Sequence, residues 1–251
     1  MNLDAYFRRI GYDGPTTPTL DTLRALHRAH LMAVPFENLD IHIGRPIVLD
    51  EERLFDKIVN QRRGGFCYEQ NGLFAAVLRQ MGYDVTLLEA RVNAREWDSG
   101  TPFDHLTLVV QLDERWLTDV GFGDSFIEPL RFDAPDSQEQ ANGIFRVLHD
   151  GVSGVHSKQT STGDWHDEYL FSLQPRTLAD FVIGCDYHQT SPNSHFTRQR
   201  VCSQATPQGR ITLSDRRLII TENGQRTERD LYSEAEFQHH LSEQFGIVLS
   251  A

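Results

Sequence analysis

The segment Arg62–Gly72 has the residue types that come closest to a reactive site. It reads Arg-Arg-Gly-Gly-Phe-Cys-Tyr-Glu-Gln-Asn-Gly, so a double glycine precedes Cys67. Glycines let the backbone turn sharply, and the apolar spacing further on predicts a helix that begins near Cys67. The free N–H groups and the dipole of a helix start lower the pKa of a thiol. Cys67 is therefore a candidate nucleophile, while a small buried packing cysteine is the alternative.

A cysteine nucleophile needs a base, and His105 is the candidate among the eleven histidines. It lies in Phe103-Asp-His-Leu-Thr-Leu-Val-Val110, an apolar strand pattern in which an imidazole requires a polar partner. A hydrogen-bonded core histidine is the alternative interpretation. Four other histidines fall in predicted helices, where we expect solvated or half-buried structural roles: His27, His30, His239 and His240.

Asp119 ends a second predicted strand and can orient His105 only in one register of the hairpin. A two-residue turn at Asp113-Glu114 would send the two side chains to opposite faces of the ribbon. A three-residue loop or a bulge at 112–114 would place Asp119 directly or diagonally across from His105 on one face. We therefore predict the three-residue loop or the bulge, which leaves the other ring nitrogen for Cys67.

The first third of the chain must position Cys67, and it has helical patterns. Leu20 to Leu31 repeat at helical spacing, and Asp50 is a predicted N-cap for a helix that contains Leu54 to Val59. A third apolar face runs from Phe74 to Met81, where Gly82 ends the pattern. These patterns predict a helical region around the double glycine.

The rest of the chain must position His105 and Asp119, and its period is that of strands. From Tyr83 to about Phe181, short β-type runs alternate with polar turns, which predicts an antiparallel sheet or a small barrel. Ala134–Gly143 is the best candidate for a mobile loop. Strands at Arg210–Leu213 and Arg217–Thr221 and a closing helix at Glu234–Phe245 follow. This order favours an α+β fold with segregated lobes.

Composition excludes several classes of protein. The 251 residues include 24 Lys and Arg against 36 Asp and Glu, and the net charge of −12 opposes nucleic-acid binding. Three cysteines are too few for a disulfide framework, and we expect Cys185 and Cys202 to be packing residues. The N-terminus has no apolar signal core, and no stretch reaches membrane-spanning length. We expect a soluble cytoplasmic protein with no membrane association.

Four segments together resemble the arylamine N-acetyltransferase family. They are Val34-Pro-Phe-Glu-Asn-Leu-Asp-Ile-His42, Arg62–Asn71, Asp119-Val-Gly-Phe-Gly123 and Ser191-Pro-Asn-Ser-His-Phe196. The match around Cys67 is the most specific one. The resemblance implies a papain- or transglutaminase-like Cys-His-Asp core, built from a helical lobe (1–83), an antiparallel β-barrel lobe (84–190) and an α/β lid (191–251).

The resemblance also implies roles for individual residues. Cys67 would accept the acetyl group, His105 would be its base and Asp119 the orienting acid. The donor would be acetyl-coenzyme A, the acceptors small arylamines, arylhydrazines or N-hydroxyarylamines, and no metal would take part. Positions that match the acceptor pocket are Phe36, Val92 and Phe122, and positions expected to border the coenzyme are Gly121, Gly123 and Phe196. All six can equally be packing or turn residues.

Two further expectations concern structure rather than chemistry. Glu37 and Arg63 are interpreted as an ion pair that ties the helical lobe to the nucleophile loop, since a buried charge needs a partner. The chain stops at Ser250-Ala251, earlier than in many family members, which puts contacts from the lid in doubt.

The Cys-His-Asp pattern leaves other functions open. Transglutaminase-like or thiol hydrolase activity, or amide synthesis on a carrier-bound acyl chain, could use the same centre. A non-catalytic binding module that retains the fold is a third possibility. The sequence does not indicate the physiological acceptor or the oligomeric state.

Overall fold

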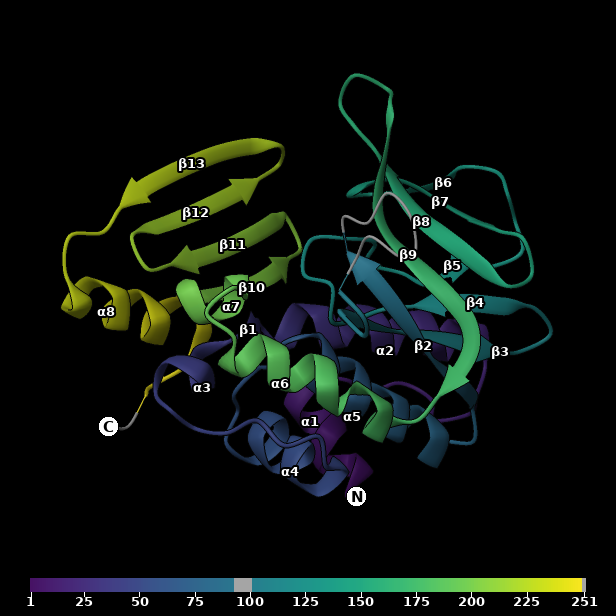
Figure 1. The fold of residues 1–251 in the computed structure, drawn as a ribbon, viewed down its shortest axis with the longest axis horizontal. Helices are drawn as coiled ribbons and strands as arrows, with labels where there is room; N and C mark the ends of the chain where they lie inside the picture. The colour runs from purple at the N-terminus through teal and green to yellow at the C-terminus, as the bar shows by residue number, and fades with distance from the viewer. Residues whose placement is uncertain (93–100, 250–251) are drawn as a thin grey trace.

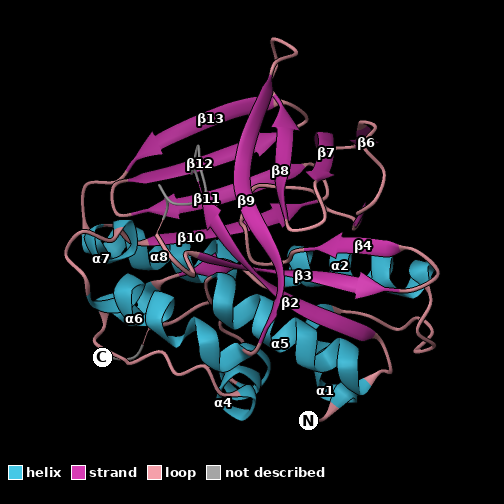
Figure 2. Cartoon of the chain, turned by 45° about the vertical axis from the view of Figure 1, so that its right-hand side comes forward, coloured by secondary structure: helices cyan, strands magenta, loops and turns pink. Residues whose placement is uncertain are grey.

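Two antiparallel sheets stand above a group of helices in the computed structural model, which describes residues 1–92 and 101–249 (Figures 1 and 2). The larger sheet has eight strands and the smaller one five. The helices of the described residues are α1 (Leu3–Ile10), α2 (Leu20–Ala33), α3 (Leu39–His42), α4 (Glu51–Phe55), α5 (Cys67–Gln80), α6 (Val182–Thr190), α7 (His195–Arg198) and α8 (Glu234–Phe245).

The predicted helices are confirmed at their N-terminal ends. The side chain of Thr19 accepts a hydrogen bond from the backbone N–H of Thr22 and so caps α2. Asp50 caps α4 by accepting from the N–H of Arg53 at 3.1 Å. After Phe55 the chain continues as a π-helical turn, Asp56–Asn60. The third helix, α5, begins at Cys67 itself.

The eight-stranded sheet curls into a nearly closed antiparallel barrel. Its order is β5 (Leu130–Arg131), β4 (Arg115–Thr118), β3 (His105–Gln111), β2 (Asp84–Val92), β9 (Trp165–Arg176), β8 (Ser153–Gln159), β7 (Gly143–His149) and β6 (Gln138–Gln140). The side chain of Gln138 on one edge strand hydrogen-bonds both backbone groups of Arg131 on the other. These bonds satisfy edge groups that would otherwise lack partners.

The hairpin of β3 and β4 has the predicted three-residue loop. Gln111 pairs with Arg115 and Leu108 pairs with Thr118, so residues 112–114 form the connection. Continuing this register past the end of β4 places Asp119 opposite Thr107, diagonal to His105 on the same face. The register required to bring His105 and Asp119 together is therefore confirmed.

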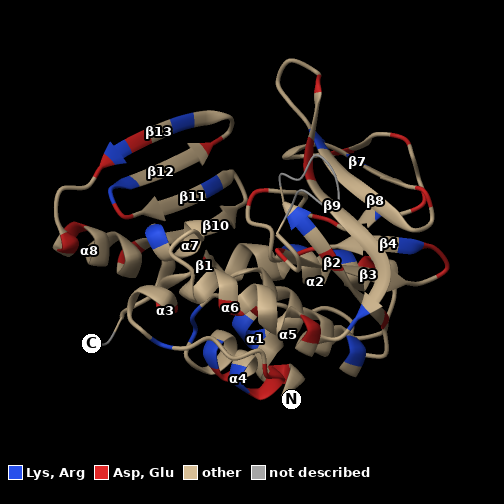
Figure 3. Cartoon of the chain, in the orientation of Figure 1, with Lys and Arg blue, Asp and Glu red and all other residues tan. Residues whose placement is uncertain are grey.

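The five-stranded sheet has the order β1 (Phe36–Glu37), β10 (Val201–Thr206), β11 (Gly209–Ser214), β12 (Arg217–Glu222) and β13 (Gln225–Asp230). Its first strand comes from the N-terminal region and carries one of the predicted pocket residues. The edge strand β13 is exposed along its whole length and shows alternating basic and acidic side chains (Figure 3). Mixed charge on an edge strand discourages pairing with other chains.

The sequence-based assignment is wrong for part of the barrel. Residues 138–140, expected in a mobile loop, form β6 and pair with β7. The strands β8, β10 and β13 were not predicted, because their burial patterns lack a clear apolar alternation. The division into lobes at residues 83/84 and 190/191 stays a prediction. The predicted effect of the early C-terminus on the lid and the cleft also stays a prediction.

The main core joins α5 to the face of β3 that looks away from the barrel. The other face of β3 lines the barrel interior. Both faces of this strand are therefore buried. The helix and the strand therefore fix each other's position over a large apolar contact. The residues of this contact include Phe74, Val77, Leu106, Leu108 and Val110.

Candidate active site

Cys67 is the first residue of α5, directly after a glycine loop that passes very close to β1. A Cβ atom at Gly64 would lie 1.9 Å from the carbonyl oxygen of Pro35. Only glycine allows this approach without moving the backbone. Downstream, the carboxylate of Glu69 accepts a hydrogen bond from the N–H of Phe66 at 3.2 Å and fixes the first turn of the helix. The loop and the cap thus determine where the sulfur lies.

His105 and Asp119 are hydrogen-bonded to each other inside the protein. His105 Nε2 lies 2.6 Å from Asp119 Oδ2, and each residue is only 2% exposed. Burial alone would raise the pKa of Asp119, but His105 and hydrogen bonds from Asn71 and Gly121 hold it below its ordinary value. Asp119 therefore stays ionised, and its contact with Nε2 leaves Nδ1 of His105 available to the cavity.

Asn71 completes this arrangement and was not singled out in the sequence analysis. Its Nδ2 donates to Asp119 Oδ1 at 2.8 Å and to the carbonyl oxygen of Leu106 at 2.6 Å. Its Oδ1 accepts from the N–H of Val120 at 2.9 Å. Asn71 lies four residues after Cys67 on α5, so both side chains share one face of the helix. This spacing of four residues is the sequence feature that could have indicated a role for Asn71 beside Cys67.

The electrostatic environment of Cys67 differs from the sequence-based expectation. Burial raises the pKa of the Cys67 thiol well above its ordinary value, and the carboxylates of Asp104 and Asp119 raise it further. A hydrogen bond from the backbone of Leu106 acts in the opposite direction. The expected lowering by the helix start is therefore wrong in direction for the thiol in this setting. A thiolate here needs a counter-ion, which a protonated His105 can supply.

The thiol and the imidazole of the predicted centre meet at a cavity of about 330 Å³. Cys67 and His105 both line it. Its other lining residues are Phe36, Val92, Asp104, Gly121, Phe122, His188, His195 and Phe196. The ring of Phe122 packs edge-on against His105, with centroids 5.3 Å apart. All three predicted acceptor-pocket residues and two of the three predicted coenzyme residues thus surround this cavity.

The third predicted coenzyme residue, Gly123, lies apart from that lining. It has a φ of +99°, with open space where a Cβ would stand. Its carbonyl oxygen accepts a hydrogen bond from the guanidinium of Arg210. Gly121 has a different constraint, because a Cβ there would lie 2.8 Å from the Cα of Cys67. Gly121 is therefore needed for the close approach of this loop to the nucleophile helix.

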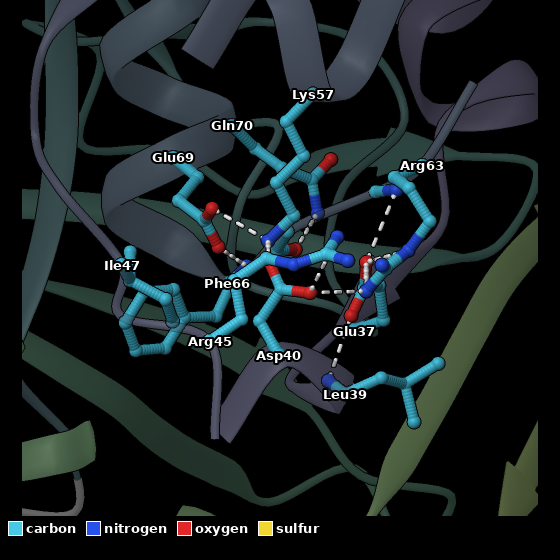
Figure 4. Close-up of polar contacts among 12 residues, drawn as sticks. Glu37, Leu39, Asp40, Arg45, Ile47, Lys57, Arg63, Phe66, Glu69 and Gln70 are labelled. Atoms are coloured by element: carbon cyan, nitrogen blue, oxygen red, sulfur yellow. Dashed lines mark hydrogen bonds and ion pairs between the residues drawn. The ribbon is translucent and has the colours of Figure 1, made fainter. Parts of the chain in front are cut away.

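A buried ion cluster lies beneath the nucleophile loop (Figure 4). Arg63 Nη2 lies 2.8 Å from Glu37 Oε1 and 2.9 Å from Asp40 Oδ1, which confirms the predicted Glu37–Arg63 pair. Lys57 Nζ lies 2.9 Å from Asp40 Oδ2 and 2.6 Å from Glu69 Oε1. The cluster thereby links β1, α3 and the π-helical turn to the cap of α5.

The charges of this cluster are unequally compensated. Lys57 and Arg63 are buried, whereas the third cation, Arg45, is half-exposed with its Nη1 3.7 Å from Asp40 Oδ1. Burial together with the negative charge of Glu37 raises the pKa of Glu69 to about 7 despite its contact with Lys57. Burial would raise the pKa of Asp40 as well, but Lys57 and Arg63 hold it below its ordinary value. Glu69, which caps the helix that begins at Cys67, can therefore bind a proton near neutral pH.

A buried histidine of α2 supports the backbone at Asp119. His27 Nδ1 donates to the carbonyl oxygen of Ile127 at 3.0 Å, and His27 Nε2 accepts from the backbone N–H of Asp119 at 3.2 Å. Burial lowers the pKa of His27 to about 4, so the ring is neutral at physiological pH. The expectation of solvated or half-buried helix histidines is wrong for three residues, which are buried: His27, His30 and His240.

A buried thiol and an imidazole that line one cavity, with a carboxylate behind them that holds the imidazole in one tautomer, define a centre able to perform thiol-dependent acyl transfer. Comparison with known proteins supports the same class. A family model described as N-acetyltransferase matches residues 19–251. The chain is 36% identical over 249 residues to the arylamine N-acetyltransferase of Escherichia coli (strain K12), covering 98% of this chain and 88% of that protein.

Two further relatives agree. The arylamine N-acetyltransferase / N-hydroxyarylamine O-acetyltransferase of Salmonella typhimurium is 34% identical over 98% of this chain and 88% of its own length. The structure of the Mycobacterium marinum arylamine N-acetyltransferase in complex with CoA superposes with a TM-score of 0.90 at 36% identity, over 98% of this chain and 93% of that one. The chain therefore belongs to the arylamine N-acetyltransferase family. None of its described helices has the length and apolar character that a membrane span needs.

Proposed function

We propose that this protein transfers the acetyl group of acetyl-coenzyme A to arylamines and arylhydrazines, and to the oxygen of N-hydroxyarylamines, through an acetyl-cysteine. The observation that carries the proposal is the shared cavity, where Cys67 and His105 are surrounded by Phe36, Phe122 and Phe196. Aromatic and aliphatic walls suit a flat aryl ring. The activities for which these relatives are named and the CoA complex of the Mycobacterium marinum enzyme support the choice of donor and acceptor.

In the first half-reaction, the thiol proton of Cys67 moves to Nδ1 of His105. The resulting thiolate attacks the thioester carbonyl, the carbon–sulfur bond to coenzyme A breaks, and the leaving sulfur takes the proton back from His105. One thioester replaces another, so position and stabilisation of the oxyanion are the main requirements. The backbone N–H of Cys67, at the first position of α5, is the proposed oxyanion donor.

In the second half-reaction, the acceptor nitrogen attacks the acetyl carbon while His105 takes up its proton. The bond to Cys67 breaks, and the sulfur recovers the proton. An arylamine is weakly basic and therefore neutral near pH 7, so its lone pair is free to attack. Water competes for the same intermediate, and a narrow apolar cavity favours the amine.

Steady-state kinetics test the proposal. We expect parallel double-reciprocal lines for acetyl-coenzyme A and a neutral aniline, as a ping-pong mechanism requires. Comparison of acetyl-, propionyl- and malonyl-coenzyme A with one aniline separates acetyl transfer from other acyl chemistry. Release of acetate at the same rate with and without amine would contradict the proposal and indicate a thiol hydrolase.

The cytoplasmic location also stays a proposal. Its support is that all three cysteines are free: Cys67, Cys185 and Cys202.

A further inference from the structure

A second histidine–aspartate pair faces the same cavity as Cys67. His188 Nε2 lies 2.9 Å from Asp104 Oδ1, and both residues are part of the cavity wall. The His188 side chain is 8% exposed and that of Asp104 16%. Asp104 directly precedes His105, the first residue of β3, so its carboxylate enters the site just before the strand that carries the proposed base. The acyl-transfer steps above use neither residue.

The pair is built by close packing of α6 against the start of β3. A Cβ at Gly184 would lie 2.1 Å from the carbonyl oxygen of Phe103, so the helix approaches this strand as closely as backbone allows. One turn further along α6, His188 reaches Asp104. The second carboxylate oxygen, Asp104 Oδ2, accepts from the N–H of Val92 at 3.0 Å. The carboxylate is therefore held on both sides.

The hydrogen bonds around His188 fit a neutral ring. His188 Nδ1 lies 3.1 Å from the hydroxyl oxygen of Ser194, which already accepts from the N–H of Phe196 at 3.2 Å. Among the contacts of the described residues, His188 Nδ1 is the acceptor for the hydroxyl hydrogen of Ser194. The ring then carries its own proton on Nε2 and donates it to Asp104. In this state the pair retains the negative charge of the carboxylate.

That negative charge acts across the cavity. The carboxylate of Asp104 is among the groups that, after burial, raise the pKa of the Cys67 thiol, so its field reaches the sulfur. An anion elsewhere in the cavity meets the same field. Charges that lie a few ångströms apart in a partly desolvated site repel each other far more strongly than in water. A carboxylate held in place in the cavity wall therefore disfavours anionic acceptors by charge repulsion.

We propose that Asp104, positioned by His188, makes this cavity selective for neutral and cationic aryl acceptors and excludes those whose ring carries a carboxylate or sulfonate. The inference rests on the proposed function and deepens it. It names Asp104 as a specificity-determining residue and His188 as the positioning residue behind it.

A pair of acceptors with the same shape and different charge tests this. We would measure kcat/KM for 4-aminobenzamide, which is neutral, and for 4-aminobenzoate, which is anionic, in the wild-type protein and in Asp104→Asn. The wild type is expected to prefer the amide at least about tenfold, and Asp104→Asn to reduce that preference about tenfold. An aspartate-to-asparagine change preserves the shape of the side chain and removes its charge. The readout is the ratio of the kcat/KM values for the two acceptors, because a general loss of activity leaves that ratio unchanged.

His188→Gln is the matched control, because it keeps the carboxylate and a donor to it. Because glutamine can still donate to Asp104, this variant should retain the preference for the neutral acceptor, whereas His188→Ala, which removes the donor that positions the carboxylate, should weaken it. Formation of acetyl-enzyme by each variant, read by intact mass, shows that the site has folded and that the proposed function holds. A wild type that uses both acceptors equally would overturn the inference, as would an unchanged ratio in Asp104→Asn or a ratio lost equally in Asp104→Asn and His188→Gln. Failure of the wild type to form acetyl-enzyme would instead overturn the proposed function.

Discussion

Asn71 holds Asp119 from the same helix that presents Cys67. Its amide donates to Asp119 Oδ1 at 2.8 Å, one helical turn after the nucleophile. The position of the orienting acid therefore depends on the helix of the nucleophile, although Asp119 itself lies in the loop after β4. The two halves of the site, far apart in sequence, are joined by this bond.

Replacement of Asn71 by alanine should weaken both fold and activity. The buried carboxylate of Asp119 loses a donor, and Leu106 and Val120 lose their side-chain partner. We expect a loss of about 1–3 kcal/mol in the free energy of unfolding, as is typical of an unsatisfied buried polar group. The kcat/KM for a neutral aniline should fall more than tenfold. Denaturant unfolding and steady-state assays check both values.

Asn142→Ala is a suitable control for this substitution. Asn142 is exposed and donates to the carbonyl oxygen of Ser125. It should retain nearly full activity and stability. If Asn71→Ala has the same stability and kcat/KM as this control, the proposed role of Asn71 in positioning Asp119 for catalysis is wrong.

Asp119→Asn should reduce the rate while preserving the fold. The carboxylate accepts a hydrogen bond from His105 Nε2–H, whereas an amide can donate there and hold the wrong tautomer of the ring. We expect a loss of roughly 10³–10⁴-fold in kcat, as is typical of a triad acid. Circular dichroism reports the fold and aniline turnover the rate. A rate within a fewfold of wild type would limit Asp119 to a structural role.

Two glycines in the loop after Asp119 should respond differently to alanine. At Gly121 a Cβ would lie 2.8 Å from the Cα and 2.9 Å from the carbonyl oxygen of Cys67, so the nucleophile must shift. We expect about a 100-fold loss of acetyl-enzyme formation, since small displacements at a reacting centre are costly. Gly123 has open space but a φ of +99°, so alanine should cost only about 1–2 kcal/mol of stability. Single-turnover acetylation of the two variants decides the matter, and equal rates would contradict the proposed constraint.

Protonation of Glu69 should make stability depend on pH. Its pKa is raised to about 7 in the folded protein against 4.5 for the free side chain, so the folded state binds more protons between these values. The contribution of Glu69 to stability is therefore greatest at low pH and declines as the pH rises toward 7. Glu69→Gln should remove this decline from the curve of unfolding free energy between about pH 4.5 and 7. Glu52→Gln, on the exposed face of α4, is the control, and identical curves for wild type and Glu69→Gln would refute the assignment.

Residue spacing within short segments was enough to predict two features of the site, the start of the nucleophile helix and the length of the β3–β4 loop. The start of α5 at Cys67 follows from the glycines and the apolar spacing, and the loop at 112–114 follows from the requirement that His105 and Asp119 share a face. The pKa of Cys67 was predicted in the wrong direction because a helix end is visible in sequence, whereas the depth of burial is a property of the whole fold.

Long-range contacts account for what the sequence could not indicate. His188 meets Asp104 across 84 positions of the chain, and His27 meets Asp119 across 92. Neither pairing has a spacing that a single sequence exposes. The strand β6 was missed for a different reason, since its glutamines bond backbone groups only seven and twelve positions earlier in the chain. Polar side chains that bond in this way look like a loop when read locally.

The most direct test of the account is the intact mass of the protein after mixing with acetyl-coenzyme A in the absence of an acceptor. We predict one added acetyl group on Cys67, located by peptide mapping, removed by hydroxylamine and discharged by a neutral aniline. Cys67→Ser should show no such thioester. An unmodified wild-type protein, or an acetyl group on Cys185 or Cys202 in place of Cys67, would contradict the central claim that Cys67 carries the transferred group.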